Sequence, residues 1–375
     1  MSASPAPRRR TWLVALPLTV VIVLAAGWSG FWFYAAAQAE TTLAAWQERE
    51  AKAGRNYACG QQAVGGYPFR FEVRCDAPKI DLASNNPPLS VQAKHVHIAG
   101  QIYDPTLLIA EIEGPVTIAV AGGPPVRATW KLAQMSLRGL PTAPQRVSLV
   151  LHDAAFDQRV GQQTIGVLRA SRIELHARML SGSVDDKPVV EIATRLVGAV
   201  APQLHPVTTE PLDASASAVV RGLDNLRPLP LPARLRQLQA ADGRLEITQS
   251  RIRQGNVTAV AAGQLGLTPS GRLDGMLRVT AVGLEGMLSK LGIDKLIPPD
   301  QAARLEPAFG ALDRLIPGLG RVARKNAGIG LAAGLAMIGQ PSELDGQKAT
   351  AVPLKFVDGA VFLGPLRVGD VRPRY

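Results

Sequence analysis

Histidines are the side chains in this chain best suited to catalysis or metal binding, and they are few. The 375 residues include five histidines. A strand would place His95 and His97 on one face, where two imidazoles offer part of a zinc site. No third ligand stands at a local spacing, and paired histidines on a polar strand face more often contact solvent. We therefore predict no metal site.

Sequence patterns typical of enzymes are also absent. His152 and Asp153 are adjacent, but a Ser-His-Asp set needs a nucleophile, and no Gly-x-Ser-x-Gly elbow occurs. Residues 328–333 (GIGLAA) superficially match a dinucleotide-binding fingerprint, yet they lie in an apolar helical stretch and follow no strand. The sequence predicts a non-enzymatic protein that needs no cofactor.

The only two cysteines of the chain, Cys59 and Cys75, are close in sequence. In an oxidising compartment such a pair predicts a disulfide bond. A bridge that closes a loop of this size stabilises the fold by about 3 kcal/mol, because it restricts the unfolded chain. The alternative is a zinc site, which would need more ligands nearby.

An uncharged run at residues 11–37 decides where the rest of the chain lies. It is longer than the roughly 20 apolar residues that a helix needs to cross a bilayer core. Trp12 and Trp32 stand near its two ends, where aromatic rings favour the headgroup layer. Three arginines precede it and keep the N-terminus in the cytoplasm. They are Arg8, Arg9 and Arg10.

The run predicts a single-pass anchor in the inner membrane. The alternative is a cleaved signal peptide, because residues 37–39 (AQA) have the small-x-small pattern. Signal peptides, however, have an apolar stretch of only about 7–15 residues. Either reading sends the same domain to the periplasm. The predicted parts are a cytoplasmic tail at 1–10, the anchor at 11–37 and an extracytoplasmic domain at 38–375.

Composition limits the partners of the exported domain. The chain has a formal charge of +11, but its basic residues are dispersed and often alternate with acidic ones, unlike a nucleic-acid stripe. The positive charge fits either solubility or attraction to anionic lipid headgroups. We expect inner-membrane lipids and other envelope proteins as partners and no nucleic acid. The oligomeric state is left open.

The hydrophobic pattern favours strands. Residues 69–75 (FRFEVRC) alternate apolar and charged side chains, as in a half-buried antiparallel strand. Similar short segments follow at spacings of about 8–15 residues, separated by Gly, Pro and Asn turns, which is typical of a meander. Asp358-Gly359 is a strong hairpin signal. Helical periodicity occurs at residues 40–53, which would extend the anchor as a stalk, and at residues 284–338.

We therefore predict an α+β, β-dominated fold. The transmembrane helix leads into a large, curved antiparallel sheet, and the helical segment at 284–338 packs on one face of that sheet. A subdivision into residues 56–210 and 211–375 is an option. In the first strand, Tyr67, Phe69 and Phe71 either face lipid near the anchor or pack in a core beside the disulfide.

Several of these stretches together resemble one proteobacterial family, the uncharacterised proteins of domain of unknown function family 2125. The resemblance covers the anchor, Trp46 and Cys59, and it spans nearly the whole chain. Its most specific part is residues 66–75 (GYPFRFEVRC), and the tail at 358–365 (DGAVFLGP) completes it. The tail is also similar to AsmA-like envelope proteins, which have an N-terminal anchor and an elongated β-rich periplasmic body.

The wider resemblance implies a role in envelope maintenance, including phospholipid handling between membranes. Neither family offers a catalytic residue to carry over. Our main hypothesis is thus a membrane-anchored envelope protein that shields lipid acyl chains in an apolar groove of its sheet. The alternative is a structural or assembly scaffold that holds another envelope protein.

Overall fold

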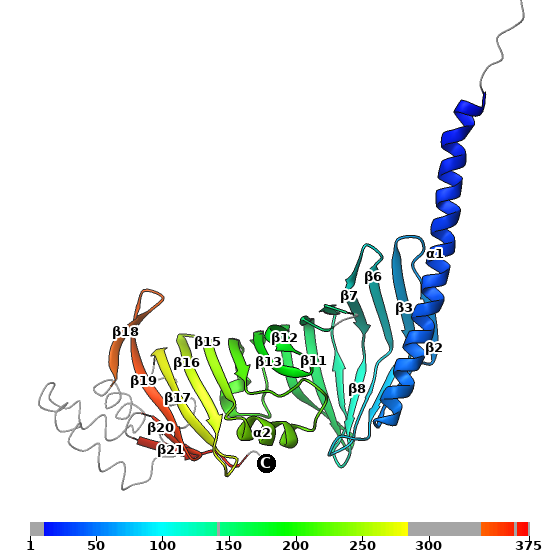
Figure 1. Cartoon of the computed structure of the whole chain (residues 1–375). Helices are drawn as coiled ribbons and strands as arrows, with labels where there is room; N and C mark the ends of the chain where they lie inside the picture. Colours follow the sequence, from blue (N-terminus) through cyan, green and yellow to red (C-terminus); the bar gives the residue numbers. More distant parts are fainter. Residues whose placement is uncertain (1–10, 141–142, 284–338, 364–365, 374–375) are drawn as a thin grey trace, which may run out of the picture.

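The computed structural model describes residues 11–140, 143–283, 339–363 and 366–373. In these residues a single long helix leads into one continuous, curved antiparallel sheet (Figure 1). The predicted β-dominated fold with an N-terminal apolar helix is confirmed. The predicted helical segment at 284–338 lies outside the described residues, as do the arginines at 8–10.

Helix α1 spans Thr11–Lys52, so the predicted anchor and the helical stretch after it form one uninterrupted helix. By length and composition, this helix can cross a membrane. Its C-terminal end is tied to the first strand: Arg55 donates to Glu50 across 2.5 Å, and the Trp46 and Tyr57 rings are 4.6 Å apart. The helix therefore has a fixed direction relative to the sheet.

The first part of the sheet consists of ten short strands, which we call the proximal strands. They are β1 (Arg55–Ala58), β2 (Gln61–Gly65), β3 (Arg70–Asp76), β4 (Lys79–Leu82), β5 (Leu89–Gln92), β6 (His95–Gln101), β7 (Asp104–Glu113), β8 (Val116–Val120), β9 (Val126–Thr129) and β10 (Leu132–Arg138).

Each consecutive pair of proximal strands is one long strand with a break in it. Thus β1 pairs with β4, and β2 pairs with β3. The same pairing of strand halves continues along the sheet through β9 and β10. The breaks lie side by side: Gly60 donates to Asp76, Ala77 to Lys94, and Lys131 to His152. They form a crease across the proximal strands, and Asp153, with φ 51°, continues it into the next strand.

Long strands without such breaks follow. Each pairs antiparallel with its neighbour in sequence, as a meander predicts. Pairing continues across the optional boundary near residue 210. The first of these is β11 (Arg146–Val160), and we call the others the distal strands. They are β12 (Gln163–Ser183), β13 (Asp186–Ala199), β14 (Leu212–Arg221), β15 (Arg244–Gln254), β16 (Val257–Leu267) and β17 (Leu273–Val282).

The sheet ends with β18 (Gln340–Leu344), β19 (Gln347–Val357), β20 (Ala360–Leu363) and β21 (Leu366–Asp370). The predicted Asp358-Gly359 turn joins β19 to β20, and both of its residues have positive φ. A short 3-10 helix, η1 (Pro206–Thr209), and helix α2 (Leu231–Ala240) interrupt the meander. Figure 1 shows α2 lying by the middle of the sheet.

The two faces of the sheet differ in chemistry from end to end. Residues that are directly opposite each other across neighbouring strands share a face. One such row, which we call the apolar row, contains only two polar side chains, Thr194 and Ser250. From β2 to β19 it is Val64, Val73, Ile98, Ala110, Met135, Leu149, Leu175, Thr194, Ala216, Ser250, Ala261, Val279 and Val352.

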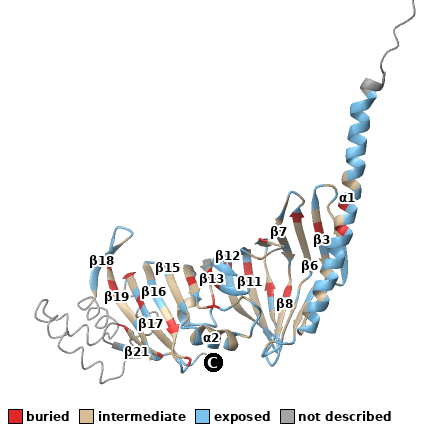
Figure 2. Ribbon diagram, viewed as in Figure 1, coloured by how far each residue is buried: buried red, intermediate tan, exposed pale blue. Residues whose placement is uncertain are grey.

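The adjacent row lies on the other face, and all of its side chains except one valine are polar or charged. From β3 to β15 it is Arg74, His97, Glu111, Gln134, Val150, Glu174, Arg195, Ser215 and Arg251. We name the two surfaces the apolar face and the charged face. Fully buried residues are scattered and most strand residues are half-buried (Figure 2), as expected of a sheet that has no second layer across it among the described residues.

Candidate functional site

The apolar part of α1 is joined to the sheet by two tryptophans. The indole N–H of Trp28 donates to the carbonyl oxygen of Pro68 across 2.8 Å, and that of Trp32 donates to Arg70 across 3.2 Å. Trp32 is only 4% exposed. Both acceptors lie in or next to the β2–β3 hairpin tip, which therefore docks on the helix within the apolar run.

Ring contacts complete this joint. Trp32 stacks on Phe71, with ring centroids 5.7 Å apart, and meets Tyr67 edge-on at 5.5 Å. Phe33 stacks on Tyr67, with ring centroids 5.9 Å apart. Offset and edge-to-face aromatic pairs add about 0.5–1.5 kcal/mol each beyond the burial of their area. Tyr67 and Phe71 thus belong to the helix–sheet joint.

Other aromatic rings at the same level point outward. Phe69 is 64% exposed, and Tyr103, at the tip of the β6–β7 hairpin, is 76% exposed. The two tips touch, because the Ile102 amide donates to the Phe69 carbonyl oxygen across 3.1 Å. Phe31 and Tyr34 of α1 are exposed as well. Figure 1 shows α1 continuing alone beyond these tips.

The predicted aromatic residues therefore divide between the two alternatives. Phe71 packs inside the joint, whereas Phe69 and one side of Tyr67 face outward. Trp32 was predicted at a membrane surface, and it occupies the centre of the joint instead of pointing outward. Trp12 lies in the first turn of α1. Sequence alternation identified the strand, but only the docked helix decides which rings it covers.

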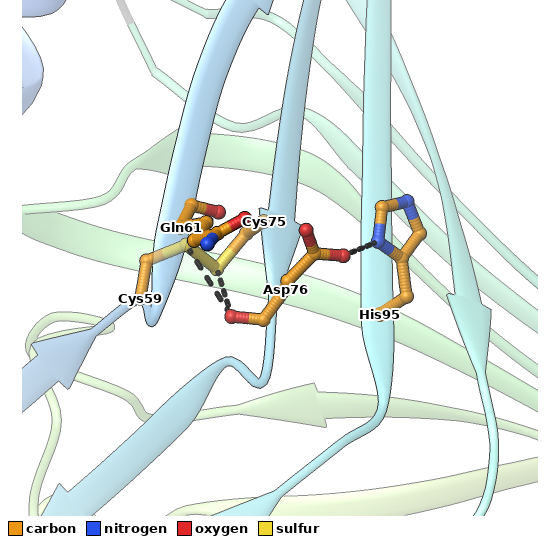
Figure 3. The surroundings of a disulfide bond; sticks show 5 residues. All are labelled: Cys59, Gln61, Cys75, Asp76 and His95. Carbon is orange, nitrogen blue, oxygen red and sulfur yellow. Dashed lines mark hydrogen bonds and ion pairs between the residues drawn. A yellow bond between two sulfur atoms is a disulfide. The ribbon is translucent and has the colours of Figure 1, made fainter.

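The predicted disulfide is present between Cys59 and Cys75, with the sulfur atoms 2.09 Å apart (Figure 3). Cys59 stands in the break between β1 and β2, and Cys75 lies in β3. The bridge therefore lies where the crease reaches the edge of the sheet, at β1 and β2. Next to it, Asp76 and His95 are 2.7 Å apart through Oδ1 and Nδ1.

Glu72 is a buried carboxylate on the charged face of the same strand. It contacts Arg70 at 3.0 Å and Arg74 at 2.6 Å. Burial raises the pKa of Glu72, but the Arg74 hydrogen bond and the charges of both arginines and His97 outweigh it, so the pKa ends below its ordinary value. His97 Nε2 lies 3.5 Å from the carboxylate and has no hydrogen-bond partner among the described residues.

The predicted histidine positions follow this geometry. His95 and His97 share the charged face, each beside an acidic residue. In the described ranges, no three His, Cys, Asp or Glu side chains group as metal ligands. Asp153, next to His152, has a positive φ and forms part of the crease, so it has a structural role there.

Helix α2 forms an apolar cavity of about 400 Å³ against the apolar face. Leu231, Leu235 and Leu238 of the helix line it, together with Leu245 and Leu265 of the sheet. This helix was not among the elements predicted from the sequence. The i, i+4, i+7 spacing of its leucines is the signal that would have found it.

Comparison with known proteins places this chain in one family. No curated protein matches this chain. The wider similarity to AsmA-like envelope proteins stays a prediction. A family model described as "Uncharacterized protein conserved in bacteria (DUF2125)" matches residues 32–372, which include Trp32, the disulfide and the whole described sheet. The chain therefore belongs to this bacterial family.

Proposed function

We propose that this chain is a membrane-anchored protein of the bacterial cell envelope that holds lipid acyl chains on its apolar face. In this proposal α1 crosses the inner membrane and the sheet stands in the periplasm. The aromatic rings at the hairpin tips rest in the headgroup layer, where amphipathic rings are favoured. A disulfide also fits an oxidising compartment.

The observation that carries the proposal is the continuity of the apolar row. It begins at Val64 and Val73, beside the joint with α1, and reaches Val352 in β19. Large side chains on this face remain open: Leu175, Ile192 and Ile252 are exposed. Soluble proteins rarely leave long apolar surfaces uncovered unless these surfaces bind something.

Acyl chains match this surface energetically. Each methylene group removed from water contributes about 0.8 kcal/mol, so a partly covered chain already binds usefully. The cavity beneath α2 offers a more enclosed place on the same face, and its volume falls within the range of typical ligand pockets. Because the face begins at the membrane anchor, a lipid leaving the bilayer would meet it first there.

Photo-crosslinking in living bacteria tests the proposal, with p-benzoylphenylalanine placed in the full chain at one of two positions. Ile252 lies on the apolar face and Met276 on the charged face, and they are 52% and 53% exposed. The two sites are thus matched in exposure and apolar character. We expect phospholipid adducts at Ile252, detected by mass spectrometry, and few or none at Met276.

Two results would overturn the proposal. Equal lipid labelling at both positions would mean nonspecific contact with the membrane. Labelling at Ile252 of another protein, or of residues 284–338 of this chain, would mean that a polypeptide covers the face; the former would favour the scaffold hypothesis. Recovery of the same adducts from detergent-purified protein would show that the lipid stays bound outside the membrane.

A further inference from the structure

Three arginines are directly opposite one another on the charged face. Arg138 of β10 pairs with Arg146 of β11, which pairs with Arg178 of β12. We call them the arginine row. Like charges directly opposite each other across strands are destabilising. An arrangement that costs stability, in a chain with many alternatives for exposed strand positions, calls for an explanation.

Counter-charges are present only at the two ends of the row. Arg138 lies 3.3 Å from Asp104, and Arg178 lies 2.6 Å from Glu191. Within the part of the chain that the structure describes, no carboxylate reaches ion-pair distance of Arg146. The central guanidinium therefore carries an uncompensated charge, flanked by two further guanidinium groups.

Space for a ligand exists on both sides of this central arginine. A hollow of about 470 Å³ is lined by Arg146 and Arg178 with Ser148 and His176, and by Glu191, whose carboxylate is paired with Arg178. A second hollow, of about 370 Å³, is lined by the whole arginine row and Gln145. Guanidinium, hydroxyl and imidazole groups are hydrogen-bond donors, and the planar guanidinium fork matches a phosphate in two parallel hydrogen bonds.

We propose that the arginine row binds a phosphate group, with Arg146 as the central contact. The row begins beside the aromatic hairpin tips, because Asp104, the partner of Arg138, directly follows Tyr103. A lipid headgroup near the membrane is one source of the phosphate, and free phosphate is the other. The site lies on the face opposite the apolar row, so it stands independently of acyl-chain binding.

Calorimetric titration of the full chain in dodecyl maltoside tests this site. The ligands are dihexanoyl phosphatidic acid and inorganic phosphate. Arg146→Gln should lower affinity about tenfold or more, because it removes the central charge-assisted hydrogen bonds. The control is Arg159→Gln, an exposed arginine at the other end of the same strand. It should leave affinity within about twofold of the wild type.

The two ligands identify the source. Binding of phosphatidic acid alone supports a lipid headgroup, and equal binding of inorganic phosphate supports a site for the free anion. Binding of neither ligand by the wild type would overturn the proposal. So would equal losses in Arg146→Gln and Arg159→Gln, since these would mean diffuse attraction to a basic surface.

Folding and function can be separated with two further measurements. Without ligand, Arg146→Gln should keep or raise the thermal midpoint, because it relieves repulsion within the row. Arg146→Lys keeps the charge but loses the planar fork, so its affinity should fall between those of the wild type and Arg146→Gln. Photo-crosslinking at Ile252 should persist in Arg146→Gln, so failure of one proposal leaves the other testable.

Discussion

The proximal and distal strands belong to the same antiparallel meander but differ in length and in the contacts that hold them. The proximal strands are short, broken at the crease, bridged by the disulfide and docked on α1. All ring pairs among the described residues lie in this region, between Trp28 and Phe71. The distal strands run unbroken for 10–21 residues, and among the described residues they have neither a disulfide nor a pair of aromatic rings. The difference indicates that the proximal end orients the sheet, while the distal strands extend its two faces.

The largest expected effect comes from removing the centre of the joint. Trp32→Ala deletes the ring contacts with Tyr67 and Phe71 and the hydrogen bond to Arg70. Truncating a buried tryptophan costs about 3–5 kcal/mol. We expect faster amide hydrogen exchange in β2 and β3, measured by mass spectrometry on the full chain in detergent, with unchanged exchange in β15–β17.

Tyr34→Ala is the control, because Tyr34 is exposed on the same helix, and among the described residues its one side-chain hydrogen bond is accepted from Gln38. It should leave exchange in β2 and β3 unaltered. If the two variants behave alike, the joint does not hold the proximal end, and the comparison between the two regions fails.

A smaller effect is expected in the distal strands from Gly263→Ala. Gly263 has φ 151°, and an added Cβ would lie 2.2 Å from the carbonyl oxygen of Met276 in the neighbouring strand. Strained backbone of this kind costs about 1–3 kcal/mol. The expected result is faster exchange in β15–β17 without any change in the proximal strands.

Gly65→Ala is a suitable partner variant, since a Cβ there meets no atom within 4 Å and the residue lies in proximal strand β2. Its exchange profile should match that of the wild type. Equal acceleration of β3 and β16 in Gly263→Ala would show that the sheet opens as one cooperative unit, which would contradict two separable regions.

Sequence reasoning recovered the parts of this architecture that are local. An uncharged run predicts its own helix, strict alternation at 69–75 predicts its own strand, and Asp358-Gly359 predicts its own turn. Two cysteines in a chain that holds no others leave one pairing. In each case the physical cause lies within a few residues or in a simple count.

The strand register and the docking of the helix could not be predicted from the sequence, because their physical causes are not local. Alternation assigns Arg146 to a face, but only the turns and breaks of three strands bring Arg138 and Arg178 opposite it. The crease is likewise invisible in any one strand, because it arises where several short interruptions align. The outward position of Phe69 depends on a helix that ends before this residue in sequence yet packs beside it.

The smallest effect is the dependence on pH that Glu72 gives to the proximal strands. The pKa of Glu72 is lower in the fold than its ordinary value of 4.5. The ionised carboxylate therefore contributes stability that is fully present above pH 4.5 and is lost as pH falls through the lowered pKa. Glu72→Gln should lower Tm by a few degrees at neutral pH and flatten the decline of Tm under acid.

Glu111→Gln is the control, because Glu111 lies on the same face and accepts a hydrogen bond from Gln134. This variant should retain the wild-type acid decline. A decline that survives unchanged in Glu72→Gln would place the acid-sensitive contacts elsewhere in the sheet.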